Sequence, residues 1–170
     1  MPQMTDPSHA LASFQQALSA GELQLQRGQL DREVWVLLDH PTGSPRFAYV
    51  RVDKGVVTAF VVLASVEPID GMPCFQIGYA VPAAYQNQGR AKDLVRASLA
   101  ELSNGLARAG IDSICIEAVV GENNEPSKRV ASKVLSAAPT KIIDQFSGLD
   151  ALHYVRIIET SPTRRTQEQR

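Results

Sequence analysis

One segment in the middle of the chain constrains the fold more than any other: residues 75–91 predict a strand, a tight turn and the start of a helix. Backbone N–H groups at the start of a helix have no partner within the helix, and the helix dipole favours negative charge there. Gly89 and Ala91 are small, so a ligand can approach the backbone closely at this turn. The segment therefore predicts an anion cradle, and a pyrophosphate is the group that suits it.

Two other phosphate-binding patterns do not describe this segment. A dinucleotide fold wants G-x-G-x-x-G and a downstream acidic residue that closes a βαβ unit. A P-loop wants Gly-Lys-Ser/Thr at the helix start. This chain has Gln86-x-x-Gly89-x-Ala91 instead.

The remaining chain alternates strand and helix patterns. Helices are predicted from the Asp6-Pro7 start to Gly21, from Gly89 to Ala109, and from the Asn124 cap onward. Strands are predicted over residues 34–38, 47–52, 56–66, 75–81, 113–119, 141–146 and 151–158, with a loop over residues 67–73. This order predicts an α/β fold with a mixed sheet. A single domain is expected over residues 1–158, followed by a flexible tail over residues 159–170.

Composition narrows the class of protein. A chain of 170 residues is expected to form one domain, and its net charge of −1 gives no reason to expect nucleic acid or an anionic membrane as partner. No apolar run is long enough to span a bilayer, and the N-terminus lacks the features of a signal peptide. Cys74 and Cys115 lie in apolar strand patterns and are expected to be buried free thiols. The cytoplasm is the expected location.

The motif Gln86-x-x-Gly89-x-Ala91, with the strand before it, resembles the pyrophosphate-binding signature of the GNAT superfamily of N-acetyltransferases. The resemblance continues through the long helix and the next strand to Asn124-x-x-Ser127, which resembles that family's second cofactor-contacting motif. It covers about residues 75–135. It implies a mostly antiparallel sheet, flanked by helices, that splays between the fourth strand (75–81) and the fifth (113–119).

The resemblance also implies acetyl-CoA as co-substrate, with a set of residues to hold it. The pantetheine arm and the acetyl group would meet the backbone near the end of the fourth strand, and the pyrophosphate would meet the loop and the helix start. The cofactor-binding residues implied are Tyr79, Ala80, Val81, Gln86, Asn87, Gln88, Gly89, Arg90, Ala91, Asn124 and Ser127.

The chain departs from the family where acid–base groups are usually found. Gln76 stands near the place of a common glutamate on the fourth strand, and Ala131 stands where many members carry a tyrosine. Ser136-Ala137-Ala138 replaces a common Gly-Phe. These departures leave room for a member that has lost turnover.

An alkylammonium must lose a proton before it can attack a thioester, so a base is needed. Glu117 on the fifth strand is the first candidate, and a carboxylate satisfied within the sheet is its alternative. Tyr79 is the second catalytic candidate, with a packing role as its alternative. His153 is interpreted as a structural histidine. No cluster in the sequence has metal-ligand spacing.

The sequence therefore predicts an acetyl-CoA-dependent N-acetyltransferase that acts directly on a primary amine. The acceptor, either a small molecule or a protein amine, stays open, as do a homodimer and a different acyl donor such as succinyl-CoA. The alternative is a non-catalytic acyl-CoA-binding or interaction module of the same fold.

Overall fold

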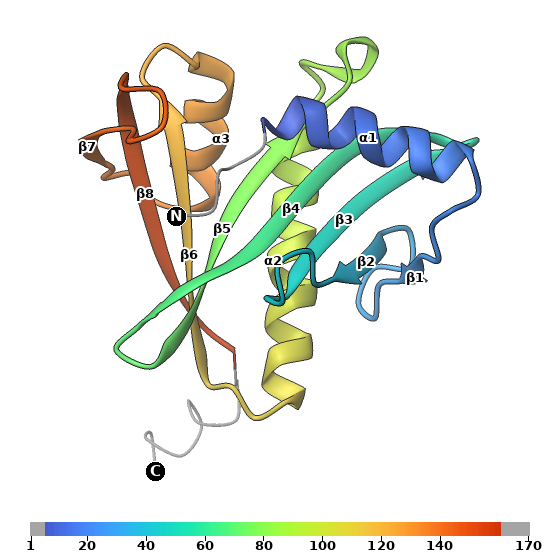
Figure 1. The fold of residues 1–170 in the computed structure, drawn as a ribbon, viewed down its shortest axis with the longest axis horizontal. Helices are drawn as coiled ribbons and strands as arrows, with labels where there is room; N and C mark the ends of the chain where they lie inside the picture. The colour runs from blue at the N-terminus through green and yellow to red at the C-terminus, as the bar shows by residue number, and fades with distance from the viewer. Residues whose placement is uncertain (1–5, 161–170) are drawn as a thin grey trace.

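The structure, a computed structural model, describes residues 6–160, which form one open sheet with helices on both faces (Figure 1). The helices are α1 (Pro7–Ser19), α2 (Arg90–Arg108) and α3 (Glu125–Val134), with a short 3-10 helix η1 (Ala83–Tyr85). The strands are β1 (Gln26–Arg27), β2 (Trp35–Asp39), β3 (Arg46–Asp53), β4 (Val56–Ile69), β5 (Met72–Ala80), β6 (Ser113–Gly121), β7 (Thr140–Ile143) and β8 (Asp150–Glu159).

The eight strands lie in the order β1-β2-β3-β4-β5-β6-β8-β7. Six of the seven neighbouring pairs are antiparallel, and only β5 and β6 run parallel. A parallel pair needs a crossover connection, which here is η1 and α2. The predicted α/β class and the mixed, mostly antiparallel sheet are confirmed.

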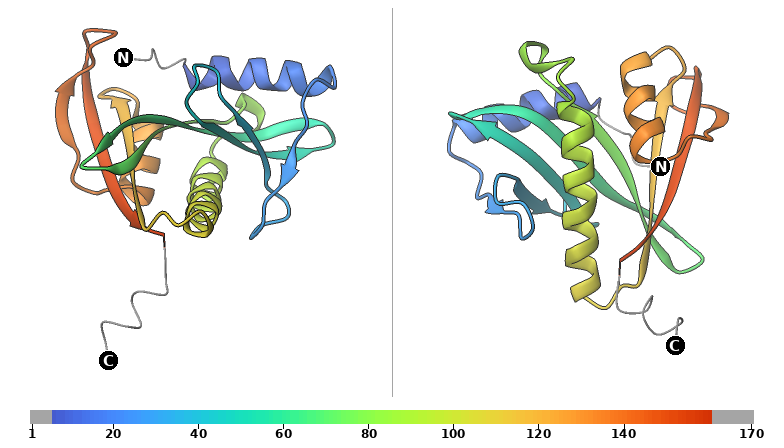
Figure 2. Two further views of the ribbon diagram at one scale, coloured as in Figure 1. Left: turned by 60° about the horizontal axis from the view of Figure 1, so that its bottom comes forward. Right: turned by 180° about the vertical axis from the view of Figure 1, so that it is seen from behind.

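Two cores fix the helices on opposite faces of the sheet (Figure 2). The larger core packs α2 and α3 against alternate residues of β3 to β6, including Ile77, Ile116 and Ala118. The smaller core packs Leu11 and Phe14 of α1 against the other face. Residues of β5 and β6 between those of the larger core therefore face the α1 side.

The loop predicted over residues 67–73 is wrong. Strand β4 continues to Ile69, which pairs with Met72 at the start of β5. Asp70 and Gly71 both have positive φ, at 49° and 77°, so a two-residue hairpin turn replaces the loop. The apolar side-chain pattern ends at Val66. The pairing of β4 with β5 nevertheless continues to Ile69 through the backbone, which a side-chain pattern cannot reveal.

The predicted start of the tail at residue 159 is also too early. Glu159 is the last residue of β8 and pairs with Ser113. Thr160 is buried, its amide donates to the Asp112 carbonyl oxygen at 2.8 Å, and its hydroxyl donates to the Ile111 carbonyl oxygen. The rest of the predicted tail, residues 161–170, lies outside the described residues.

None of the helices in residues 6–160 is both long enough and apolar enough to cross a membrane.

Candidate cofactor cleft and active site

The sheet opens between β5 and β6. These strands pair over three residues each, from the Cys74–Cys115 pair to the Gln76–Glu117 pair. Beyond this short joint the strands separate (Figure 1), and a cavity of about 720 Å³ lies between them. The splay expected between the strands at residues 75–81 and 113–119, which are β5 and β6 here, is therefore present.

The cavity is lined mainly by parts of the chain between β5 and α3. Strand β5, the loop after it, the start of α2, the end of β6 and the start of α3 all contribute, and the start of α1 adds Asp6, Pro7 and Ser8. Of the implied cofactor-binding residues, Ala80 and Gln88 do not line the cavity, whereas the other nine do: Tyr79, Val81, Gln86, Asn87, Gly89, Arg90, Ala91, Asn124 and Ser127. Ala80 packs with the α1 core instead.

The loop between η1 and α2 is built around two left-handed residues, Asn87 at φ 61° and Gly89 at φ 73°. Gly89 is the N-cap of α2 and makes no side-chain cap. The first hydrogen bond within the helix is donated by Asp93 N to Gly89 O, at 3.0 Å. The amides of the first helical turn before Asp93 are therefore not used inside the helix and are available to an anion.

Side chains of this loop support its own backbone. The Gln86 side-chain amide donates to the Val81 carbonyl oxygen at 2.9 Å, so it closes the loop on itself. The Arg90 Nε atom donates to the Gln88 Oε1 atom at 3.0 Å, and the Arg90 guanidinium stacks over the Tyr85 ring at 5.0 Å. Because one face and one nitrogen of the guanidinium are already used, Arg90 is held in place beside the helix start.

Tyr79 spans the cavity from β5 to α3. Its hydroxyl donates to the Ser127 carbonyl oxygen at 2.7 Å and accepts from the Ser127 hydroxyl at 2.9 Å. Burial raises the pKa of the Tyr79 hydroxyl, so the group is protonated at neutral pH. Asn124 caps α3 by accepting from Ser127 N at 3.2 Å, while it also lines the cavity.

Charge is distributed unevenly around the cavity. Its basic lining residues, Arg90, Lys92, Arg129 and Lys133, all belong to α2 and α3. The acidic lining residue, Asp6, belongs to the α1 side, where it also caps α1 by accepting from Ser8 N at 2.8 Å. A polyanion would therefore be drawn to the α2 and α3 side of the cavity.

The start of α1 forms one side of the cavity, and its position depends on Gly78. Nothing in the sequence pattern indicates this role for Gly78. A Cβ atom built on Gly78 would lie 3.0 Å from Pro7 Cγ, closer than an ordinary contact, so Pro7 would have to shift. Gly78 thus lets the start of α1 lie directly on β5, and Pro7 becomes a wall of the cavity. Only the packing of α1 on the sheet could have revealed this contact.

Glu117 lies beside the cavity and not in its lining. Its side chain, 22% exposed, contacts His153 of β8, with 3.0 Å between Glu117 Oε2 and His153 Nε2. Val119, which does line the cavity, is the cross-strand partner of His153. From the sequence alone His153 is interpreted as structural. Its contact with Glu117 depends on the register of β6 with β8, which cannot be read from a side-chain pattern.

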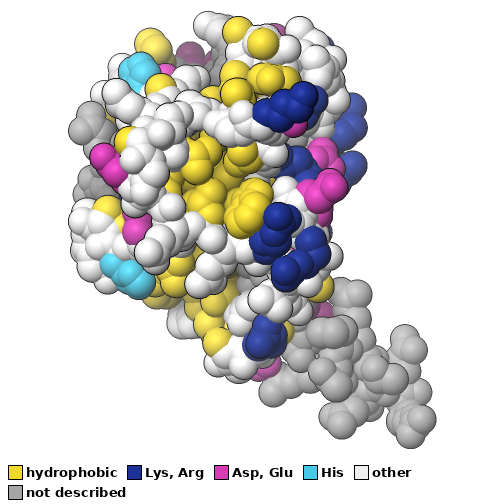
Figure 3. All heavy atoms as spheres, turned by 90° about the vertical axis from the view of Figure 1, so that its right-hand side faces the viewer, with side chains coloured by type: hydrophobic (Ala, Val, Ile, Leu, Met, Phe, Trp, Pro, Cys, Tyr) yellow, Lys and Arg dark blue, Asp and Glu magenta, His cyan; other side chains and the backbone are white. Residues whose placement is uncertain are grey.

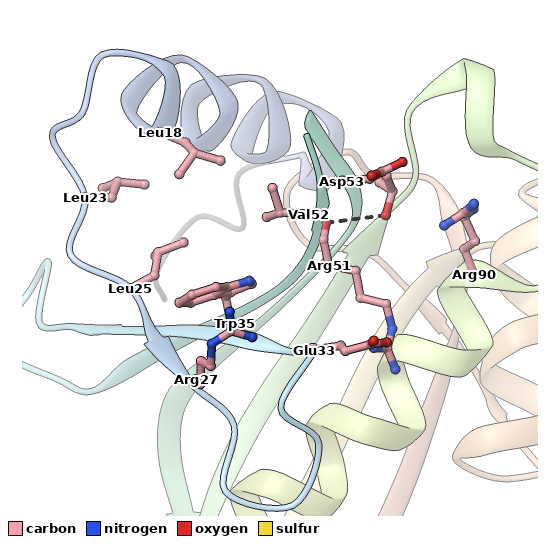
Figure 4. Close-up of a pocket in the computed structure, with 11 residues that line it drawn as sticks. Leu18, Leu23, Leu25, Arg27, Glu33, Trp35, Arg51, Val52, Asp53 and Arg90 are labelled. Atoms are coloured by element: carbon pink, nitrogen blue, oxygen red, sulfur yellow. Dashed lines mark hydrogen bonds between the residues drawn. The ribbon is translucent and has the colours of Figure 1, made fainter. Parts of the chain in front are cut away.

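A second cavity of about 740 Å³ lies on the far side of Arg90. On that side of the molecule, hydrophobic side chains gather in a hollow with Lys and Arg along one flank (Figure 3). Leu18, Leu23, Leu25 and Trp35 form its apolar part, and Arg51 and Arg90 lie opposite (Figure 4). Of the implied cofactor residues only Arg90 reaches it, so the cleft between β5 and β6 is the candidate cofactor site.

The wall of this second cavity is held by charged groups. Arg51 bonds to Asp31 and to Asp93 of α2, at 2.8 Å each. Glu101 of α2 is only 8% exposed, and it accepts from the amides of Gln29, Leu30 and Asp31 at 2.7–2.8 Å. These contacts attach the segment before β2 to α2, whose start forms the cofactor cleft.

Comparison with known proteins gives matches among solved structures. The sequence matches no protein-family model and no curated protein. A GNAT-family acetyltransferase from Streptococcus pneumoniae shares 13% identity at a TM-score of 0.52, over 92% of this chain and 98% of the other. A ribosomal L7/L12 alpha-N-protein acetyltransferase in complex with coenzyme A shares 19% identity at a TM-score of 0.54, over 94% of both chains.

A chimeric spermidine N-acetyltransferase, built from the Vibrio cholerae protein and a second one, is also similar. It shares 13% identity at a TM-score of 0.51, over 69% of this chain and 68% of the other. These identities are low, but the alignments with the first two structures run along nearly the whole of both chains. The likeness therefore concerns the entire fold and not one motif.

Proposed function

We propose that this chain, which has the fold of the GNAT-family acetyltransferases, is an acetyl-CoA-dependent N-acetyltransferase that acts on a primary amine. One observation carries the proposal: the cavity between β5 and β6 ends at the uncapped start of α2, where the Gln86-x-x-Gly89-x-Ala91 loop supplies free amides. A cleft through a sheet with an anion cradle at one end suits a long thioester cofactor with phosphates at its far end.

The residues present suit coenzyme A. The amides of Gly89, Arg90 and Ala91 would hold the pyrophosphate, and Lys92, Arg129 and Lys133 are placed to attract further phosphate charge. The β5 backbone beyond Gln76 has no strand partner on the β6 side, so its polar groups are available to the amides of a pantetheine arm.

The cofactor would supply the activated thioester. The protein would bind the two substrates, orient them and transfer the protons. Placing the amine against the thioester carbonyl supplies much of the rate. A backbone N–H near Tyr79, Ala80 or Val81 would stabilise the oxyanion. The Tyr79 hydroxyl would donate to the departing thiolate by turning its hydrogen away from the Ser127 carbonyl oxygen. Glu117, beside the narrow end of the cleft, would take part in removing the proton of the amine.

The acceptor is proposed by class only. Similar structures include an enzyme named for spermidine and one named for a ribosomal protein N-terminus, so both small-molecule and protein amines are candidates. We place the reaction in the cytoplasm, because Cys74 and Cys115 are buried free thiols, as a reducing compartment allows. A homodimer belongs to the same proposal.

A second candidate function is a non-catalytic acyl-CoA-binding module. It is favoured by Ala131, which is fully buried and has no hydroxyl where many GNAT enzymes carry a tyrosine, and by Gln76 on β5. Release of free CoA from acetyl-CoA over a panel of amines separates the two. Binding without thiol release for any amine would favour the module.

Cofactor binding is tested by substitution in the loop. CoA should raise the melting temperature of the wild type by mass action. Gly89→Asp should abolish that shift, because it places a negative charge where phosphate would lie. Gly43→Asp is the matched control: both glycines have positive φ, and neither Cβ would meet an atom within 4 Å.

Both variants should lose similar stability, but only Gly43→Asp should keep the shift caused by CoA. A Gly89→Asp protein that binds CoA as the wild type does would contradict the pyrophosphate assignment.

A further inference from the structure

We propose that His153, held by Glu117, accepts the proton of the attacking amine, and that Glu117 is the positioning residue of this pair. The inference rests on the proposed acetyl transfer. It changes the role of Glu117, which the sequence alone suggested as the base itself.

The two side chains lie on one face of the sheet beside the cleft. Ile116 and Ala118 face the α2 and α3 core, so Glu117 and Val119 face the α1 side. His153 is directly opposite Val119 in the β6–β8 ladder and therefore shares its face. Because Val119 lines the cleft, His153 and Glu117 flank a wall residue of the cavity.

Glu117 lies at the narrow end of the cleft, and His153 lies on β8 opposite Val119, two residues further along β6; neither is itself in the cavity lining. Glu117 pairs with Gln76, the last pair before β5 and β6 separate. The phosphate loop is at the wide end, past the end of β5. A cofactor held by its phosphates at the wide end would direct its acyl group toward the narrow end. The basic residues lie on the α2 and α3 side, which leaves the α1 side for a cationic amine.

The contact between the pair sets the roles of the imidazole nitrogens. His153 Nε2 is 3.0 Å from Glu117 Oε2, so Nε2 carries the hydrogen and donates to the carboxylate. In the neutral imidazole this leaves Nδ1 as the nitrogen without a hydrogen, and so as the proton acceptor. The same contact stabilises the imidazolium once it forms, as a carboxylate does for the histidine of a catalytic triad.

The proton and charge balance of the step is simple. The ammonium gives one proton to His153 Nδ1, directly or through one water, and becomes a neutral amine. Its nitrogen attacks the thioester carbon, the C–S bond breaks, and the second proton that the nitrogen loses on becoming an amide goes to the departing thiolate, which leaves as the free thiol. In the β7–β8 ladder the residue opposite His153 is the uncharged Thr140, and 30% of the His153 side chain is exposed to solvent.

The test compares His153→Gln with the wild type and with His40→Gln, a control at an exposed histidine in the loop before β3. We expect His153→Gln to lower kcat by about 10²-fold near neutral pH, the usual effect of a positioned base. The deficit should shrink as pH rises, because the amine then arrives neutral. A weakly basic analogue of the same acceptor, already neutral at the assay pH, should show little deficit at any pH.

Glu117→Gln should lower kcat less than His153→Gln does, with the same pH trend. The melting temperature and the shift caused by CoA should stay at wild-type values in both variants. An equal loss with both acceptors at every pH would assign His153 a structural role, and no loss would exclude it from the reaction. A wild type that binds CoA but acetylates no amine would instead contradict the proposed function.

Discussion

The Tyr79 hydroxyl donates to the Ser127 carbonyl oxygen at 2.7 Å, and this bond joins β5 on one side of the cleft to α3 on the other. The Ser127 hydroxyl returns a second bond to the same tyrosine oxygen at 2.9 Å. Ala131, buried one turn further along α3, carries no hydroxyl. A phenol therefore reaches the start of α3 from the opposite strand, although α3 itself does not supply one.

Tyr79→Phe should lower kcat by about tenfold or more, because the leaving thiolate loses its proton donor. The shift in melting temperature caused by CoA should persist, since the phosphate loop is unchanged. Thiol release and thermal shift measured on the same preparation check this. Tyr85→Phe is the matched control, because the Tyr85 ring contacts Arg90 at the other end of the cleft. Wild-type turnover in Tyr79→Phe would assign the hydroxyl to packing alone.

Glu101→Ala should destabilise the fold by about 3 kcal/mol, because three backbone amides before β2 lose a charged acceptor. Urea denaturation followed by circular dichroism measures the change. Glu67→Ala, at an exposed position on β4, should change stability by less than about 0.5 kcal/mol. Equal values for the two variants would mean that water replaces the carboxylate without cost.

Asp31 gives the fold a pH dependence of known sign. Its hydrogen bond from Arg51 holds its pKa below the ordinary value of 3.8. A lowered pKa contributes stability that is present above the ordinary value and is lost as pH falls through the lowered one. Asp31→Asn should therefore melt below the wild type at pH 7, and the two curves should converge in acid. A gap that stays constant down to pH 2 would contradict this account.

The two thiols should be inert in the folded chain. Burial, and then the neighbouring Cys115 thiol, raise the pKa of Cys74 to about 12, and both side chains are about 1% exposed. A thiol reagent at pH 8 should label neither cysteine in the native protein and both in guanidinium chloride. Rapid labelling of the native protein would show that the joint between β5 and β6 opens often.

Local signals in the sequence located much of the fold and of the cleft. Asp6 before Pro7 and Asn124 before Glu125 are N-caps that act within one helical turn, so they can be recognised from the sequence alone. Gly89 has positive φ and begins α2 as the motif predicts. These features depend only on neighbours in the chain.

The features that sequence analysis missed depend on register and packing. The His153–Glu117 contact exists because β8 pairs with β6 at one particular offset, and many offsets suit the same apolar pattern. The roles of Gly78 and Glu101 depend on where α1 and the segment before β2 lie in space. The loop predicted over residues 67–73 was wrong because Pro68 and Gly71 are typical of loops, whereas the backbone there keeps the β4–β5 pairing up to a two-residue turn.

The three-residue joint between β5 and β6 also divides the sheet into two parts, here called plates, which meet at this joint. Each plate is a well-paired antiparallel unit, β1 to β5 and β6 to β8, and the plates are joined by few ladder bonds. Past the joint, the two facing strand edges are internal edges, with backbone groups that exchange hydrogen with water as those of an outer strand do. A ligand with amides of its own would fill both edges at once, and so turn two plates into one continuous sheet.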